Sequence, residues 1–314
     1  MNRRGFILGA AGTVLAGASS SAFASGKAEP FQKPDCPVID VRLRPRYPGF
    51  SEQYKLATVE ACCGYAGFPV PESVKNDSQE LMLKEMDEAG ITVGMALKGK
   101  LTPDALVKMQ KHFKGRVRSM CTLDASNPID KNMELIEKYV VNGPFKGIYM
   151  EPGRDKVCTM PNDPKLFPLY DFCQEKGFPV GLMTGGRNSE VNFIRTTDHA
   201  AIVDIAVAFP KLKLLMSHGG WPQVEEILGV AYWYKNVYVA PDMYLFGGCH
   251  GAADFINAAN TYLQDRFCFG TAYPIMPMKE SVAAYRTFFP KKEIYEKVMW
   301  KNAAEFFQID DIKA

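Results

Sequence analysis

The sequence predicts a (β/α)8 TIM barrel, an α/β fold in which parallel strands alternate with helices. Short apolar runs typical of buried strands alternate along the chain with amphipathic stretches of helical period. Eight strand-like runs are each followed by a helical stretch, which is the count of this barrel. Spacing alone does not show that the sheet closes, so an open doubly wound sheet remains the alternative fold.

The elements follow one another in a regular order. The predicted strands cover residues 38–41, 91–97, 117–123, 145–150, 180–183, 212–216, 237–239 and 267–269. The predicted helices lie near residues 78–89, 102–113, 130–140, 164–176, 198–209, 222–234, 252–264 and 278–289, with a last helix near 293–307. A capping residue precedes a proline at three of the helix starts, Thr102-Pro103, Asn127-Pro128 and Asp163-Pro164.

Residues 1–24 are predicted to form a twin-arginine export signal. Arg3 and Arg4 precede small and apolar residues, and Ala22-Phe23-Ala24 resembles a signal cleavage site. The apolar run is too short and too rich in glycine for a stable membrane span, and it lacks the polar face of a barrel helix. We therefore expect export to the periplasm or another extracytoplasmic space, with residues 25–314 as a single barrel domain.

The charge of the mature chain argues against nucleic acid as a partner. Cleavage of the signal removes two of the 37 basic residues and none of the 35 acidic ones, which leaves 35 of each. A chain with no net charge and no basic run offers little attraction to a phosphate backbone. The sequence therefore argues against the nucleic-acid-binding class.

Eight cysteines are scattered along the chain without the C-x-x-C spacing of zinc ribbons or redox sites. Export permits disulfides, but several cysteines sit within apolar strands or helices, where a buried free thiol is favoured. Cys62 and Cys63 lie in a Gly/Pro-rich loop and are the pair expected to be open to bridging. This loop, residues 47–71, is long enough for a lid or a dimer contact.

Polar residues gather where the predicted strands end. In a barrel of this kind the chemistry is built at that edge, because the loops after the strands share one mouth. The segments concerned are residues 40–44, 149–152, 183–186, 217–220 and 270–274.

Four of these segments resemble motifs of the amidohydrolase-related family that includes aminocarboxymuconate-semialdehyde decarboxylase and γ-resorcylate decarboxylase. That family typically reads Ile-Asp-x-His-x-His, Pro-Val-x-x-His-x-Gly, His-x-Gly-Gly and Gly-x-Asp-Tyr-Pro on strands 1, 5, 6 and 8. The corresponding segments here are Ile39–Arg44, Pro179–Gly185, His218–Gly220 and Gly270–Pro274. The resemblance runs from about Val38 to Phe307, and it implies a TIM barrel, a hydrolase or lyase activity and a homodimer.

The positions of the family's metal ligands hold other residues in this chain. The resemblance implies that the two strand 1 histidines, the strand 5 histidine and the strand 8 aspartate hold the metal. These positions read Arg42, Arg44, Met183 and Ala272. Two guanidiniums, a thioether and a methyl group cannot hold a hard divalent cation as imidazoles and carboxylates do. His218 remains where the family has its acid/base, so we expect an enzyme with no metal and no other cofactor.

Arg42 and Arg44 are predicted to clamp a small anionic organic substrate. They lie two residues apart on one strand, so their side chains leave on the same face, which the family pattern directs into the barrel mouth. Two buried guanidiniums need an acidic partner. That partner is either a substrate carboxylate, gripped by paired hydrogen bonds, or a protein carboxylate. The protein candidates are Glu151, Asp40 and Asp242.

Further candidates follow from the strand ends. His218 ends an apolar strand, and an imidazole pKa of about 6.5 suits proton transfer, with a core histidine as the alternative. Tyr273 is a candidate proton donor or a core aromatic residue. Thr184 and Arg187 follow the fifth strand and are candidates for substrate contact, although a solvated loop arginine is equally consistent with the sequence. The remaining histidines are expected to be surface or ordinary helix residues, His250, His112 and His199.

Three classes of function remain. The first, which we favour, is a metal-independent enzyme acting on a small carboxylic acid, lactone or enol acid, with His218 as acid/base. The second is a ligand-binding protein that has kept the cavity and lost turnover. The third is a hydrolase that has recruited a metal through new ligands, drawn from Glu151, His218, His250 or a cysteine. The site rather than the fold must separate them.

Overall fold

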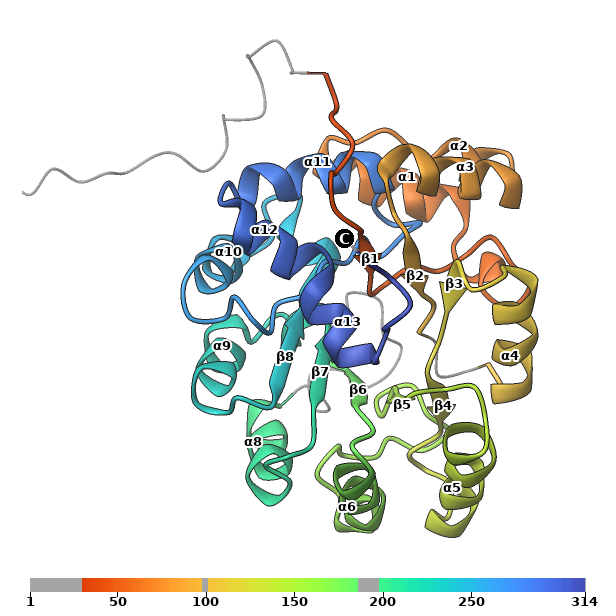
Figure 1. Cartoon of the computed structure of the whole chain (residues 1–314), viewed down its shortest axis with the longest axis vertical. Coiled ribbons are helices and arrows are strands. Elements are labelled where there is room, and N and C mark those ends of the chain that lie inside the picture. The colour runs from red at the N-terminus through yellow and green to blue at the C-terminus, as the bar shows by residue number, and fades with distance from the viewer. Residues whose placement is uncertain (1–29, 98–100, 186–197, 314) are drawn as a thin grey trace, which may run out of the picture. The chain divides into compact units, whose positions relative to one another are not determined.

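The structure is a computed structural model of the whole chain, and it describes residues 30–97, 101–185 and 198–313. Parallel strands form the wall of a barrel, and helices surround that wall (Figure 1). The strands are β1 (Ile39–Asp40), β2 (Val93–Met95), β3 (Val117–Arg118), β4 (Cys121–Leu123), β5 (Ile148–Met150), β6 (Val180–Met183), β7 (Leu214–Ser217) and β8 (Val237–Ala240). The predicted export signal, residues 1–24, lies outside the described residues.

The sheet closes on itself, which excludes the open-sheet alternative. β1, β2 and β3 pair in order, and so do β4 to β8. Residues 267–269 join the two ends: Cys268 N donates to Val239 O at 3.0 Å, and Val41 N donates to Phe269 O at 3.0 Å. β3 and β4 are two halves of the predicted strand 117–123. The predicted (β/α)8 barrel is therefore confirmed.

The helices follow the predicted order. They are α1 (Leu56–Ala66), α2 (Glu72–Lys75), α3 (Gln79–Ala89), α4 (Pro103–His112), α5 (Ile129–Ile136), α6 (Phe167–Lys176), α8 (His199–Ala208), α9 (Val224–Trp233), α10 (Ala252–Asn260), α11 (Met278–Phe288), α12 (Lys292–Glu296) and α13 (Asn302–Phe307). Short helical turns are η1 (Ser51–Gln53), η2 (Glu137–Val141), η3 (Pro164–Leu166), η4 (His218–Gly220), η5 (Asp242–Leu245) and η6 (Lys297–Lys301). α5 ends at Ile136 and is continued by η2. α10 ends well before its predicted boundary, because Thr261 leaves the helical conformation.

Two of the three predicted helix caps are confirmed. The Thr102 hydroxyl accepts a hydrogen bond from the first turn of α4 at 3.3 Å, and the Asp163 carboxylate does the same for η3 at 3.0 Å. Each satisfies an amide that the helix leaves unpaired. The prediction for Asn127 was wrong, because Pro128 occupies the cap position of α5 and Asn127 stands one residue too early.

Apolar side chains fill the barrel and close one of its ends. Tyr149, Leu215 and Tyr238 of the wall pack in one buried cluster with Phe306 and Phe307 of α13. α13 therefore covers the end of the barrel at which the strands begin, as its position over the centre in Figure 1 shows. The opposite end, where the strands finish, is left for the site.

The segment from residue 47 to 71 is not the loop that its glycines and prolines predicted. It contains η1 and α1, and Val59 and Cys63 of α1 are buried in the core. Cys62 and Cys63 are consecutive helix residues, and the described cysteines form no disulfide. The expected opening of this pair to a disulfide is thus a wrong prediction, because Cys63 instead packs inward and donates to Ile275 O at 3.4 Å.

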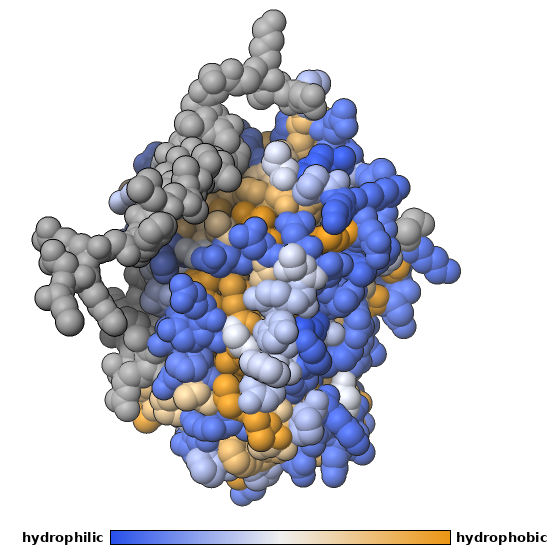
Figure 2. Space-filling view, turned by 90° about the vertical axis from the view of Figure 1, so that its left-hand side faces the viewer, coloured by the Kyte–Doolittle hydropathy of each residue, from blue (hydrophilic) through white to orange (hydrophobic). Residues whose placement is uncertain are grey.

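The outer surface follows the amphipathic pattern of the helices. On the face shown in Figure 2, hydrophilic side chains cover most of the described surface, and apolar ones show in narrow bands between them. Trp233 at the end of α9 is an exception, with 75 % of its surface exposed. Within the described residues, no helix is long and apolar enough to cross a membrane.

Candidate active site

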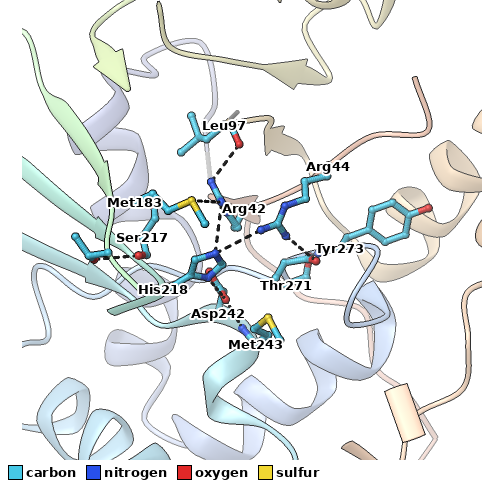
Figure 3. A network of polar contacts seen from close by, with 12 residues as sticks. Arg42, Arg44, Leu97, Met183, Ser217, His218, Asp242, Met243, Thr271 and Tyr273 are labelled. Carbon is cyan, nitrogen blue, oxygen red and sulfur yellow. Dashed lines mark hydrogen bonds and ion pairs between the residues drawn. The ribbon is translucent and has the colours of Figure 1, made fainter. Parts of the chain in front are cut away.

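The residues that follow the strand ends meet in the barrel mouth (Figure 3). Arg42 and Arg44 come after β1, Met183 ends β6, and His218 and Asp242 begin the short turns η4 and η5 after β7 and β8. His218 and Asp242 have φ values of 68° and 44°, in the left-handed region that residues with a side chain seldom adopt. Such strained turns cluster at functional sites, because the required direction of the side chain there outweighs the cost of the backbone strain.

Arg42 is held by partners on several sides. Its Nη1 donates to the Tyr149 hydroxyl at 2.6 Å and to Leu97 O at 3.1 Å. Its Nη2 lies 3.6 Å from Met183 Sδ and 3.8 Å from Oε1 of Glu151. The side chain is 2 % exposed. A buried guanidinium with a carboxylate and several acceptors is a stable arrangement, so Arg42 is fixed in place.

Arg44 has a different environment. Its Nη1 donates to Ala272 O at 2.9 Å, and its guanidinium lies over the Tyr54 ring, 5.2 Å from the ring centre. It is 6 % exposed, yet it belongs to none of the ion pairs formed between described residues. Burial lowers the pKa of Arg44, and the charge of Arg42 acts in the same direction. The site thus holds one guanidinium that lies beside a carboxylate, that of Arg42, and one that pairs with no described carboxylate, that of Arg44.

His218 is oriented by Asp242. Nδ1 lies 2.8 Å from Oδ2 and 2.9 Å from Oδ1 of that carboxylate, and the imidazole and the Tyr244 ring form a T-shaped pair with ring centres 5.5 Å apart. Burial, helped by Arg42 and Arg44 and opposed by Asp242, lowers the pKa of His218 to about 4. The imidazole is therefore neutral at neutral pH, with its proton on Nδ1 facing the carboxylate.

The other ring nitrogen faces the two arginines. Nε2 of His218 lies 3.4 Å from Nη2 of Arg42 and 3.5 Å from Nη2 of Arg44. A guanidinium carries only donors, so Nε2 must be the acceptor, which agrees with a proton on Nδ1. The sequence prediction of two arginines near one histidine at the mouth thus corresponds to direct contacts.

Tyr273 does not join this group. Its hydroxyl lies 2.6 Å from Ser73 Oγ, which in turn donates to Glu85 at 2.5 Å. Figure 3 shows its ring directed away from His218. The part of Tyr273 that contacts the strand 1 arginines is its backbone, since Tyr273 O accepts from Arg44 N at 3.0 Å. The structure corrects the candidate proton donor to a core aromatic residue.

Thr184 lies at the mouth but is engaged in the barrel wall. Its hydroxyl and its backbone N both donate to Ser217 O at 3.0 Å, which joins the ends of β6 and β7. Arg187 lies outside the described residues. His250 has an exposed side chain, and its carbonyl accepts a hydrogen bond from Trp221 Nε1 at 3.2 Å.

Of the three carboxylates proposed as partners of the arginines, Glu151 alone pairs with a guanidinium among the described residues. Asp242 binds His218 instead, and Asp40 accepts from the backbone N of Arg42 at 2.9 Å and from Thr271 N at 3.0 Å. The sequence reasoning also missed Tyr149 as a partner of Arg42. A signal existed, because Tyr149 and Glu151 lie two residues apart at the end of one strand and therefore share a face.

The site does not fit the metal that the family resemblance implies. The four substituted positions do meet, since Arg42 contacts Met183 and Arg44 contacts Ala272 O. A dication between them would face two positive charges at short range. In the described part of the chain, no group of three or more His, Cys, Asp or Glu side chains is arranged to hold a metal ion. Nothing in these residues supports a relocated metal site either.

Comparison with known families shows to which family the chain belongs. A family model described as amidohydrolase matches residues 87–309. The chain belongs to the amidohydrolase family. The matched stretch includes Met183, His218 and Ala272, while the strand 1 arginines precede it. A search of curated proteins finds no match for this chain.

Solved structures share the barrel. An uncharacterized TIM-barrel protein from Bordetella bronchiseptica is 32 % identical with a TM-score of 0.79, over 87 % of this chain and 98 % of that one. A 2,6-dihydroxybenzoate decarboxylase from Rhizobium is 15 % identical with a TM-score of 0.63, over 88 % and 99 %. A 4-oxalomesaconate hydratase from Rhodopseudomonas palustris is 14 % identical with a TM-score of 0.60, over 86 % and 95 %. The last two show the fold alone.

Proposed function

We propose that this protein is an enzyme that acts on a small organic carboxylate or lactone without a metal. His218 is the general base, and the strand 1 arginines form the anion site. One observation carries the proposal: His218 has a carboxylate on Nδ1 and two guanidiniums at Nε2. General base catalysis needs a base and a group that orients it, here a carboxylate. It is helped by an adjacent positive charge that stabilises the anion formed in the reaction.

The arginines supply the reason for an anionic substrate. Arg42 Nε is buried without a hydrogen-bond partner among the described residues, and Arg44 lacks a carboxylate. Unpaired buried donors cost about 1–3 kcal/mol each, and more when charged. A carboxylate or enolate oxygen supplies the missing acceptors, and a guanidinium grips such a group with two parallel hydrogen bonds.

The protonation state of His218 indicates the order of events. With a pKa of about 4, the imidazole starts neutral and can only accept a proton. This favours addition of water over a decarboxylation that begins with a proton given to carbon. For a lactone, Nε2 takes a proton from water while the water oxygen bonds to the carbonyl carbon. The ring C–O bond then breaks, and the imidazolium returns the proton to the leaving oxygen.

The names of similar structures support a carboxylate substrate. Two of them are called 2,6-dihydroxybenzoate decarboxylase and 5-carboxyvanillate decarboxylase, and another is called 4-oxalomesaconate hydratase. Each name denotes a substrate with a carboxylate. Hydration, as in the last name, is a reaction that a neutral base initiates.

The proposal is tested with a panel of small lactones and unsaturated carboxylic acids, measured with and without a chelator. His218→Asn should leave the affinity nearly unchanged and lower turnover by about 10²–10⁴. His112→Asn is the matched control, because His112 is exposed on α4 and should keep full activity. A ligand that binds tightly and is returned unchanged by the wild type would identify a carboxylate-binding protein without turnover. Activity that is lost on chelation and restored by zinc would identify a relocated metal site.

A further inference from the structure

The two arginines of the site are not equivalent. Arg42 donates to Tyr149 and Leu97 O and lies beside Glu151. Apart from its contact with His218, the side chain of Arg44 has one hydrogen bond to a described residue, to Ala272 O, and it lies over the face of the Tyr54 ring. Moving Arg42 would strand a buried carboxylate, whereas moving Arg44 strands no charged group. Arg44 is therefore the arginine that is able to change partners.

Arg44 also contacts Nε2 of His218, the atom that accepts the proton in the proposed reaction. Its Nη2 lies 3.5 Å from Nε2 of His218, beside the Arg42 contact at 3.4 Å. While two guanidinium N–H groups share the lone pair of Nε2, that nitrogen is a weaker acceptor for a proton on water or substrate. An incoming carboxylate competes for the same N–H groups and forms stronger, charge-assisted hydrogen bonds with them.

We propose, on the basis of the function proposed above, that Arg44 couples substrate recognition to how strongly the base is hydrogen-bonded. Its guanidinium shares Nε2 of His218 with that of Arg42 in the free protein and turns to the anionic group of the substrate on binding, which removes one of these two contacts. The reacting centre then needs an anionic group within reach of a single guanidinium, as in a lactone or enol that carries a carboxylate close to the reacting carbon. An uncharged lactone or ester leaves both guanidiniums at Nε2, so charge on the substrate determines specificity.

The electrostatics of the pocket act in the same direction. Among the described residues, the charged groups in contact with the imidazole are Arg42 and Arg44 after β1 and Asp242 in η5. Glu151 and the Tyr149 hydroxyl, at the end of β5, lie against Arg42. The side chains of α9 and α10 nearest to the glycines of η4 are uncharged, Ile227 and Phe255. Positive neighbours lower the pKa of an imidazole. An anion on Arg44 offsets one of them, so it should raise the pKa of His218.

The test is an NMR titration of the histidine rings, with formate as the probe and ionic strength held constant with sodium chloride. The chain has four histidines, so the His218 signal is the one lost in His218→Asn. Formate should raise the pKa of His218 by about one unit or more in the wild type. Arg44→Gln should show a raised pKa without formate and no further response. Arg118→Gln is the matched control, because Arg118 pairs with Asp311 at the surface, and it should behave as the wild type.

Two results would overturn the inference. One is a His218 signal that does not respond to formate at about 0.5 M in the wild type, well above the concentration at which a bidentate site should fill. The other is a full response that persists in Arg44→Gln. Neither readout depends on turnover, so the inference and the proposed function can fail separately. Coupling without any catalysed reaction would leave Arg44 as the switch of a binding protein, whereas turnover without coupling would keep the enzyme and remove the switch.

Discussion

Nδ1 of His218 lies 2.8 Å from Oδ2 of Asp242, and both side chains are buried. The two residues begin η4 and η5, directly after the neighbouring strands β7 and β8, so the barrel wall fixes their separation. A carboxylate at Nδ1 keeps the lone pair on Nε2 and stabilises the imidazolium that forms when Nε2 accepts a proton. Asp242 is therefore a positioning residue for the base.

Asp242→Asn should reverse the tautomer of His218. Oδ1 of Asp242 accepts the backbone N–H of Met243 at 2.5 Å, so the amide oxygen of an asparagine should take this position and its NH₂ should face Nδ1. The proton of His218 then moves to Nε2, and turnover should fall by about 10²–10⁴. Nitrogen NMR of the imidazole reports the tautomer directly. Asp77→Asn, at an exposed carboxylate, is the control, and an unchanged tautomer in Asp242→Asn would contradict the assigned role.

The stability of the protein should depend on His218 between about pH 6.5 and pH 4. The pKa of His218 is about 4 in the folded state, whereas an unfolded histidine has a pKa of about 6.5. Above pH 6.5 both states hold a neutral imidazole. As the pH falls to 4, the unfolded chain takes up a proton that the folded protein resists, so the free energy of unfolding decreases by on the order of 3 kcal/mol.

Urea denaturation of the wild type and His218→Asn across this range isolates the contribution. Burial raises the pKa of Asp40 to about 6, and this carboxyl acts in the opposite direction, because the folded state takes up its proton first. The effect of Asp40 is common to both proteins and cancels in the difference between them. Parallel stability curves for the two proteins from pH 7 to pH 4 would show that the imidazole is not held neutral by its surroundings.

The barrel was predictable because its information is local. Each strand is a short apolar run and each helix has its own period, so the order of elements can be read without knowing how they pack. α1 was not predicted, because Leu56–Ala66 has almost no amphipathic pattern and lies among glycines and prolines. Closure of the sheet depends on pairing between residues such as Val41 and Phe269, far apart in sequence, and needed the structure.

The site was predictable only in part. Motif spacing identified Arg42, Arg44 and His218, because the residues after parallel strands share one mouth. The sequence did not show which residue each charged side chain contacts. Whether Asp242 meets His218 or an arginine depends on backbone turns of positive φ at both residues, and no residue type signals these turns in advance. The direction of Tyr273 was likewise not readable, because its hydroxyl contacts Ser73, which is far away in the sequence.

Export should depend on the paired arginines near the amino terminus. Arg3 and Arg4 precede the apolar run, and the small-residue site ends at Ala24. Replacement of both arginines by lysine should leave the precursor in the cytoplasm with its signal attached, since the twin-arginine route reads the guanidinium pair. Cell fractionation and mass spectrometry of the amino terminus measure this. Normal cleavage and export of the double lysine variant would remove the prediction.

Arg42→Ala should destabilise the fold far more than loss of a surface arginine. Arg42 Nη2 lies 3.8 Å from Glu151 Oε1 deep in the barrel, and its removal leaves a buried carboxylate without a cation. Breaking such a pair costs about 3–5 kcal/mol. Arg118→Ala is the control, because the Arg118–Asp311 pair lies at the surface and should be worth under about 1 kcal/mol. Urea denaturation at pH 7 compares the two variants. Equal losses of stability would mean that Arg42 is not held in place by its ion pair with Glu151.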